Sequence, residues 1–227
     1  MTPSNARNKN GSSLPWGGLA LLAAALYAIS NIAGIPWLGW ITKPLPVLCL
    51  LGLLPVWSPR RDLYRDLLMA GFVLSAIGDL FMIKDHMFIL GLSSFLLAHI
   101  CYIAAFSSSA PARIPLHPVR IVPFLAFGAL MLWFLWPSLG EMKIPVLMYV
   151  AVILAMGWRA AARVGQPGEN DRAHWLGLLG AISFILSDSM IAIGKFHAPI
   201  PAGHFLVMAT YWAGQLGIAL SVARRAV

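Results

Sequence analysis

The feature that most constrains the fold of this chain is a series of apolar runs, each close to the length needed to cross a lipid bilayer. A helix needs about 20 apolar residues for this, because each residue adds about 1.5 Å along the axis. Hydrophobic residues make up 59% of the chain and charged residues 11%. That balance leaves too little polar surface to cover a water-soluble domain. We therefore expect an all-α, multi-pass membrane protein.

We predict eight transmembrane helices in a single domain, residues 16–227, preceded by a disordered cytoplasmic tail, residues 1–15. The expected helices cover residues 16–33, 43–57, 63–83, 88–106, 119–139, 144–162, 174–194 and 203–223. The second run contains Pro44, Pro46 and Pro55, which predicts a broken or tilted helix. A cleaved signal peptide is the alternative for the first run, but this run is long for such a segment and lacks a clear small-residue cleavage site.

The positions of lysine and arginine test this arrangement, because cytoplasmic connectors of membrane proteins are enriched in basic residues. With the N-terminus inside, the inner side receives twelve basic residues and the outer side four. The inner set is Arg7, Lys9, Arg60, Arg61, Arg65, Arg113, Arg120, Arg159, Arg163, Arg172, Arg224 and Arg225, and the outer set is Lys43, Lys84, Lys143 and Lys195. This asymmetry predicts that both termini are cytoplasmic.

The net charge of +8 raises the alternative of a nucleic-acid partner. The basic residues, however, are scattered singly between apolar runs and form no stripe with interleaved aromatic residues. We therefore predict no nucleic-acid binding and take the bilayer as the surroundings of the protein. The sequence leaves the oligomeric state open.

A faint internal repeat suggests a parallel four-plus-four duplication. Lys43 and Lys143 each open a similar proline-containing segment, and the spacing from Gly71 to Asp79 equals that from Gly180 to Asp188. Both pairs run in the same direction in the predicted topology, as a parallel duplication requires. Chance similarity between apolar segments is the alternative.

Of the eight acidic residues, six lie in predicted connectors or at helix ends, and only Asp79 and Asp188 are embedded in the interior of predicted membrane helices. A charged side chain at the centre of a membrane helix costs about 2.5–3.5 kcal/mol on insertion scales, so each of these residues is a candidate functional group. The predicted topology places both in the outer half of the bilayer at similar depth. A purely structural hydrogen-bond network is the alternative explanation for the pair.

Several other polar side chains are predicted at the same level of the membrane. They are Lys43, His99, Tyr102, Tyr149, Tyr211 and Gln215. Each has a simpler explanation, such as helix packing for His99, an interfacial aromatic belt for the tyrosines, or a flanking charge for Lys43. Their convergence nevertheless predicts an internal cavity open to one leaflet. No HExxH or comparable cluster is present, so we expect no metal and no cofactor.

Two buried carboxyl groups facing one pocket suit acid–base chemistry. Burial and mutual repulsion favour the protonated form of one acid, which can then donate a proton, while the other stays ionised. No serine or cysteine nucleophile elbow is apparent, so hydrolysis by acid–base catalysis is favoured over an acyl-enzyme route. A pocket between membrane helices is reached from the bilayer, which predicts a lipid substrate.

Short motifs in this chain resemble those of the YhhN family, which includes lysoplasmalogenases. They are Thr42 to Pro46 (TKPLP), Gly78-Asp79, the spacing of Phe95, His99 and Tyr102, the spacing of Phe184 and Asp188, and that of Tyr211 and Gln215. The resemblance covers nearly the whole chain from the second predicted helix onward. Each motif is weak by itself, but their order along the helices is fairly specific.

The resemblance implies an integral membrane enzyme that hydrolyses the vinyl-ether bond of a lysoplasmalogen, a single-chain ether lysophospholipid. The products would be a fatty aldehyde and a glycerophospho-base. In this scheme Asp79 and Asp188 are the catalytic acids, with their individual roles undecided, and Lys43 contacts the lipid phosphate. The other polar residues of the set support the acids, and the expected location is the inner membrane of a bacterium. A proton-coupled transporter and a non-catalytic lipid-binding protein remain the alternatives, because buried acids also build proton relays.

Overall fold

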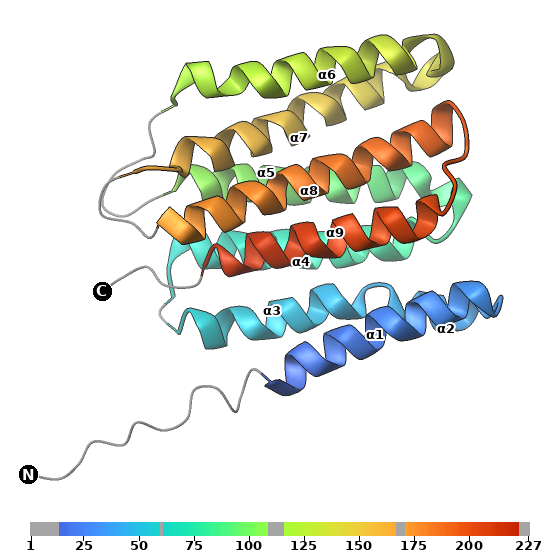
Figure 1. The fold of residues 1–227 in the computed structure, drawn as a ribbon, viewed down its shortest axis with the longest axis horizontal. Coiled ribbons are helices and arrows are strands. Elements are labelled where there is room, and N and C mark those ends of the chain that lie inside the picture. The colour runs from blue at the N-terminus through green and yellow to red at the C-terminus, as the bar shows by residue number, and fades with distance from the viewer. Residues whose placement is uncertain (1–13, 60, 109–115, 167–170, 223–227) are drawn as a thin grey trace, which may run out of the picture.

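The computed structural model describes residues 14–59, 61–108, 116–166 and 171–222, which form a bundle of helices (Figure 1). The helices are α1 (Leu14–Ile32), α2 (Pro36–Thr42), α3 (Leu45–Trp57), α4 (Leu63–Phe81), α5 (Phe88–Ser107), α6 (Val122–Leu135), α7 (Lys143–Arg163), α8 (Asp171–Phe196) and α9 (Gly203–Leu220). Short 3-10 turns lie at η1 (Asp85–Met87), η2 (Pro118–Ile121), η3 (Trp136–Ser138) and η4 (Gly140–Met142). The described residues contain no strand, so the all-α prediction is confirmed.

The helices lie side by side and alternate in direction (Figure 1). Since α2 and α3 follow one another as a single interrupted segment, the described residues form eight such segments, with the start of α1 and the end of α9 at the same end of the bundle. Five segments of the described chain are long and apolar enough to cross a membrane. They are Pro36–Trp57, Asp85–Ser107, Pro118–Ser138, Gly140–Arg163 and Asp171–Phe196. Eight crossings and the parallel duplication stay predictions.

The proline-rich second segment is interrupted, as its sequence predicts, but it begins earlier than residue 43. Pro36 starts α2, because its fixed φ suits the first turn of a helix, and Pro44 separates α2 from α3. Lys43 therefore lies at the junction inside the segment Pro36–Trp57 and not at its beginning. The predicted start at residue 43 was wrong because the apolar stretch before it, taken as a connector, is helical.

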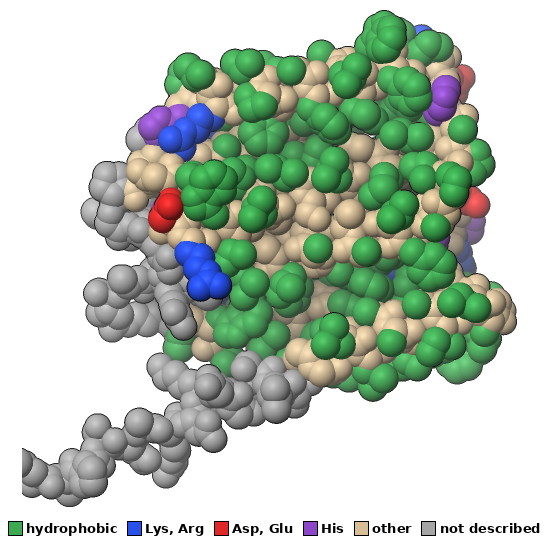
Figure 2. All heavy atoms as spheres, in the orientation of Figure 1, with side chains coloured by type: hydrophobic (Ala, Val, Ile, Leu, Met, Phe, Trp, Pro, Cys, Tyr) green, Lys and Arg blue, Asp and Glu red, His purple; other side chains and the backbone are tan. Residues whose placement is uncertain are grey.

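The outer surface of the bundle is apolar, as a lipid-facing surface should be. Figure 2 shows one face covered largely by hydrophobic side chains, with the charged groups in view gathered toward its two ends. Large apolar side chains such as Leu21, Val119 and Trp133 are at least 75% exposed. The described lysines and arginines divide between the two ends, as Arg172 at the start of α8 and Lys195 at its end illustrate.

Hydrogen bonds tie the segments together at the arginine-rich end. Arg120 donates to the carbonyl oxygens of Ala161 and Val164 at the end of α7, each at 2.7 Å. At the start of α4, Asp62 caps the helix by accepting from the Arg65 backbone amide at 2.8 Å.

The predicted disordered tail lies outside the described residues, apart from Leu14 and Pro15, which begin α1. Arg7, Lys9, Arg60, Arg113, Arg224 and Arg225 of the charge analysis also lie outside them.

The core of the bundle sits where α4, α5, α7, α8 and α9 meet. The pairs α4–α5 and α8–α9 are packed most extensively, whereas α6 contacts mainly α7 and leaves most of its surface exposed. Phe72, Phe184 and Tyr102, which come from α4, α8 and α5, are fully buried there. This arrangement brings the polar residues of five helices, α4, α5, α7, α8 and α9, to one region, while α6 packs only against the edge of the bundle.

Candidate active site

Asp79 lies in the last turns of α4 and is sealed inside the bundle, with 2% of its surface exposed. The hydroxyl of Tyr211, on α9, donates to Asp79 Oδ2 at 2.9 Å. The half-buried Lys43 lies within electrostatic range of the same carboxyl group. A carboxylate in the membrane interior is therefore provided with both a hydrogen-bond donor and a nearby positive charge, as such a group requires.

Asp188, on α8, has a different environment from Asp79. The hydroxyl of Tyr149, on α7, donates a short hydrogen bond to Asp188 Oδ2. The Asp188 side chain is only half-buried, because it borders a pocket between α5, α6, α7 and α8. Of the two acids, Asp188 is thus the one that a molecule entering from the α6 side can contact.

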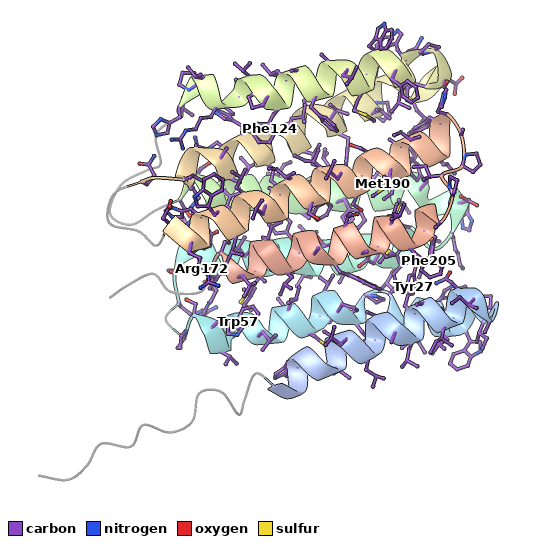
Figure 3. All side chains as sticks on the ribbon, in the orientation of Figure 1. Tyr27, Trp57, Phe124, Arg172, Met190 and Phe205 are labelled. Atoms are coloured by element: carbon purple, nitrogen blue, oxygen red, sulfur yellow. The ribbon has the colours of Figure 1, made fainter. Side chains whose placement is uncertain are left out.

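The pocket beside Asp188 has an empty volume of about 800 Å³, including its open part. Asp188, Ser189 and Tyr149 supply its polar groups, and the rest of its wall is hydrophobic. Phe124 on α6 and Met190 on α8 mark two of the neighbouring helices in the side-chain view (Figure 3). A largely apolar pocket with one carboxyl group suits the hydrocarbon chain of a lipid whose reactive atoms lie at Asp188.

The two acids belong to one electrostatic network even though only one of them borders the pocket. Their charges lie within interaction range of each other. Tyr102, on α5, donates to Gln215 Oε1 on α9 at 2.9 Å and lies 3.2 Å from Ser75 Oγ on α4. Side-chain hydrogen bonds therefore link α4, α5 and α9 around Asp79, and a separate hydrogen bond links α7 and α8 at Asp188.

His99, on α5, lies between the two halves of this network. Its ring centroid is 5.4 Å from that of Tyr149, 6.3 Å from that of Tyr102 and 4.7 Å from that of Phe184. The side chain is fully buried, and neither ring nitrogen makes a hydrogen bond to the described residues. A buried imidazole without a protein partner is uncommon and leaves both nitrogens able to bind a small polar molecule such as water.

The structure brings together all eight residues that the sequence singled out. These are Lys43, Asp79, His99, Tyr102, Tyr149, Asp188, Tyr211 and Gln215, and each contacts another member or lies within its electrostatic range. The prediction that both acids line one pocket was wrong, because Asp188 borders the pocket whereas Asp79 is not part of its wall. The catalytic roles of the eight residues stay predictions.

Three further residues that the sequence analysis named only for their spacing also form part of the site. Phe95 and Phe184 form an aromatic wall against Tyr211, with ring centroids 5.8 Å and 5.2 Å from its ring. Gly71, on α4, permits close contact between α4 and α5, because a Cβ atom there would overlap the Tyr102 ring. Gly71 lies eight residues before Asp79 on a face of small residues, and such a face permits close contact between helices.

Metal binding has no visible basis in the described residues. No three side chains of His, Cys, Asp or Glu lie together there as ligands would. What the arrangement can do by itself is move protons, because two carboxyl groups, each held by a tyrosine hydroxyl, adjoin an apolar pocket and an unpartnered imidazole.

Known proteins are similar to this chain over most of its length. The sequence model of the YhhN family matches residues 38–222. Lysoplasmalogenase TMEM86B of Homo sapiens is 37% identical over 194 residues, covering 85% of this chain and 79% of that protein. Lysoplasmalogenase TMEM86A of Bos taurus is 35% identical over 199 residues, covering 82% and 78%. The uncharacterized membrane protein YhhN of Escherichia coli O157:H7 is 28% identical over 214 residues, covering 91% and 98%. No solved structure matches the chain significantly.

Proposed function

The chain belongs to the YhhN family, and on this basis we propose that it is a membrane-embedded hydrolase of the vinyl-ether bond of a lysoplasmalogen. The observation that carries the proposal is Asp188, a carboxyl group at the wall of an otherwise apolar pocket between membrane helices. Two relatives named lysoplasmalogenases, 37% and 35% identical to this chain, support the same reaction class. The products are a fatty aldehyde and a glycerophospho-base.

The reaction begins with a proton on Asp188. Tyr149 occupies one carboxyl oxygen, Oδ2, which leaves Oδ1 to carry a proton toward the pocket. Transfer of that proton to the β-carbon of the vinyl ether forms a C–H bond and leaves an oxocarbenium ion at the α-carbon. Water adds to the α-carbon and returns a proton to the carboxylate. The resulting hemiacetal then breaks its C–O bond to give the aldehyde and the alcohol.

Asp79 acts in this scheme as the ionised partner of Asp188. The nearby ammonium group of Lys43 and the hydroxyl of Tyr211 both stabilise a negative charge on Asp79. A fixed negative charge within range of the pocket stabilises the oxocarbenium ion as it forms, which is how preorganised electrostatics lowers a barrier. Lys43 therefore serves the carboxylate, in place of the contact with a lipid phosphate that the sequence suggested.

The remaining polar residues hold these groups and the attacking water. The free nitrogens of His99, next to Tyr149, are placed to orient a water molecule near the pocket. Tyr102 and Gln215 fix each other at 2.9 Å and maintain the wall behind Asp79. These are positioning roles, since the contacts of each residue are with other side chains of the site.

We further propose that the protein crosses a bacterial inner membrane eight times, with both termini in the cytoplasm. The alternation of eight segments and the separation of arginines from lysines at opposite ends support this topology. Trp57 and Arg172 lie toward one end of the bundle, and Tyr27 and Phe205 toward the other (Figure 3). In this orientation both acids belong to the outer half of the membrane.

Purified protein in maltoside detergent tests the function directly. We expect it to release fatty aldehyde from an alkenyl lysophosphatidylethanolamine, because the site needs no partner and no ion gradient. Aldehyde is measured with a coupled alcohol dehydrogenase, and a saturated alkyl-ether analogue without the double bond serves as the negative substrate. Uptake into sealed vesicles without any aldehyde release would point to a carrier and contradict the proposal.

Replacing Tyr149 with phenylalanine is expected to lower kcat about 10-fold or more while leaving KM nearly unchanged. The variant keeps the ring that lines the pocket but removes the hydroxyl bound to Asp188, and a hydrogen bond to a charged group is worth about 1.5–3 kcal/mol. Steady-state kinetics on the same substrate separates the two constants. A rise in KM at constant kcat would show that Tyr149 serves substrate packing alone.

A further inference from the structure

The pocket beside Asp188 ends at an ion pair that plays no part in the mechanism above. Phe88 and Phe196 line the pocket at the end of the bundle where α8 finishes, and their rings pack at a centroid distance of 6.1 Å. The ammonium group of Lys195 lies 5.2 Å from the centroid of the Phe88 ring. The same nitrogen lies 3.0 Å from Asp85 Oδ1. A positive and a negative group are thus held together at the pocket's end.

The distance from this ion pair to Asp188 can be read from α8 itself. Lys195 follows Asp188 by seven residues, which is about two turns, so both project from the same face and are separated by roughly 10 Å along the helix. Ile191 and Ala192, which lie between Asp188 and Lys195 on α8, also line the pocket. The glycerol and phosphate of a lysophospholipid whose ether bond lies at Asp188, together with the long lysine side chain, can bridge this separation.

The rest of the pocket gives the lipid its direction. On the other side of Asp188 the wall consists of apolar residues nearer the middle of the helices, among them Phe127, Leu154 and Ile185. A hydrocarbon chain belongs there, which leaves the polar end of the lipid to point toward Lys195. This is also the orientation of a lysophospholipid in the outer leaflet under the proposed topology.

The ion pair matches a headgroup that carries both signs of charge. The Lys195 side chain is 38% exposed and that of Asp85 98%, so both can exchange partners without unfolding the site. An exposed pair of this kind contributes little stability, about 0–1 kcal/mol, so its rearrangement costs little. A phosphate can replace Asp85 beside Lys195, and an ammonium group beyond the phosphate can then reach the Asp85 carboxylate.

We propose that Lys195 and Asp85 form the binding site for a zwitterionic phospho-ammonium headgroup, with the phosphate on Lys195 and the headgroup ammonium on Asp85. This assignment rests on the proposed function, because it takes the reactive end of the lipid to be at Asp188. It gives Lys195 and Asp85 a role in selecting the substrate, beyond marking one side of the membrane.

Binding of a non-hydrolysable ligand tests the proposal apart from catalysis. The ligand is a saturated alkyl-ether lysophosphatidylcholine, and its Kd is measured by calorimetry with the protein in maltoside micelles. Lys195→Gln is expected to weaken binding about fivefold, the upper range for an exposed ion pair. Lys84→Gln is the matched control, because Lys84 lies in the α4–α5 connector and makes a similar contact, 5.3 Å from the Trp40 ring, with a residue outside the pocket wall.

A second ligand separates the two charges of the headgroup. An alkyl-ether glycerophosphate without the ammonium group should bind the wild-type protein more weakly than the zwitterionic ligand, and Asp85→Asn should abolish that preference. Equal Kd values for Lys195→Gln and Lys84→Gln, or an unchanged preference in Asp85→Asn, would overturn the proposal. Absence of aldehyde release by the wild type would instead contradict the proposed function, and the binding experiment would still decide the headgroup site.

Discussion

Asp188→Asn is expected to lower the turnover of a lysoplasmalogen by at least about 100-fold, the lower limit for loss of a general acid. Asparagine has nearly the same shape and can still accept the hydrogen bond from Tyr149, but it has no proton to give to the β-carbon. The fold and the pocket should therefore survive. The measurement is kcat for aldehyde release by the purified variant, together with Kd for the non-hydrolysable ether ligand, which should stay close to the wild-type value.

Two further aspartate variants make this result specific. Asp66→Asn removes a partly exposed carboxylate at the arginine-rich end, where it pairs with Arg65, and is expected to keep wild-type turnover. Asp79→Asn should also lower kcat at least about 100-fold, because the oxocarbenium ion loses its fixed counter-charge. Near-normal turnover in both Asp79→Asn and Asp188→Asn would remove the proposed mechanism.

Gly180→Ala is expected to destabilise the protein strongly, because it adds a methyl group where the backbones of two helices meet. The new Cβ atom would lie 2.6 Å from the Ile218 backbone nitrogen and 2.7 Å from the Gly214 carbonyl oxygen, both on α9. Backbone atoms of a neighbouring helix cannot rotate away as a side chain can, so α8 and α9 must separate. Overpacking of this kind costs about 1–3 kcal/mol and occasionally more. The measurement is the thermal unfolding midpoint in detergent, which should fall clearly.

Gly194→Ala supplies the control on the same helix. A Cβ atom at Gly194 would meet no atom within 4 Å, so the substitution changes helix propensity without changing packing. Its unfolding midpoint should equal or exceed that of the wild type. Equal midpoints for Gly180→Ala and Gly194→Ala would mean that α8 and α9 are not in backbone contact.

The membrane character and the identity of the two acids could be predicted because both depend on local composition. Asp79 and Asp188 are recognisable since each is an acid inside an otherwise apolar run, where a charge without a function is costly. Lys195 and Asp85 were not recognisable as a binding site. In the sequence, a charged residue at the end of an apolar run has the same pattern whether its side chain faces the lipid headgroups, a connector or a pocket. The predicted topology was already explained by charges that face the headgroups, so nothing in it pointed to a pocket.

The break near Lys43 was only partly predictable. The prolines indicated that the second segment is interrupted, but they did not show on which side of Lys43 the membrane helix begins. That decision depended on Pro36 starting α2 and on α1 packing against both α2 and α3. Lys43 consequently lies inside the segment and within electrostatic range of the Asp79 carboxyl group.

The amino-acid sequence by itself determined the helical, membrane-embedded class of this protein and the residues that cannot be buried without a reason. Only the tertiary structure decided that Tyr149 pairs with Asp188 and that Tyr211 pairs with Asp79. It also decided that, of the two acids, only Asp188 borders the pocket. The physical reason is that these helices are apolar on nearly all sides, so hydrophobic periodicity does not specify how each is rotated. Rotation is settled by close contacts between helices, such as that of Gly180 with α9, and these contacts join residues far apart in the chain.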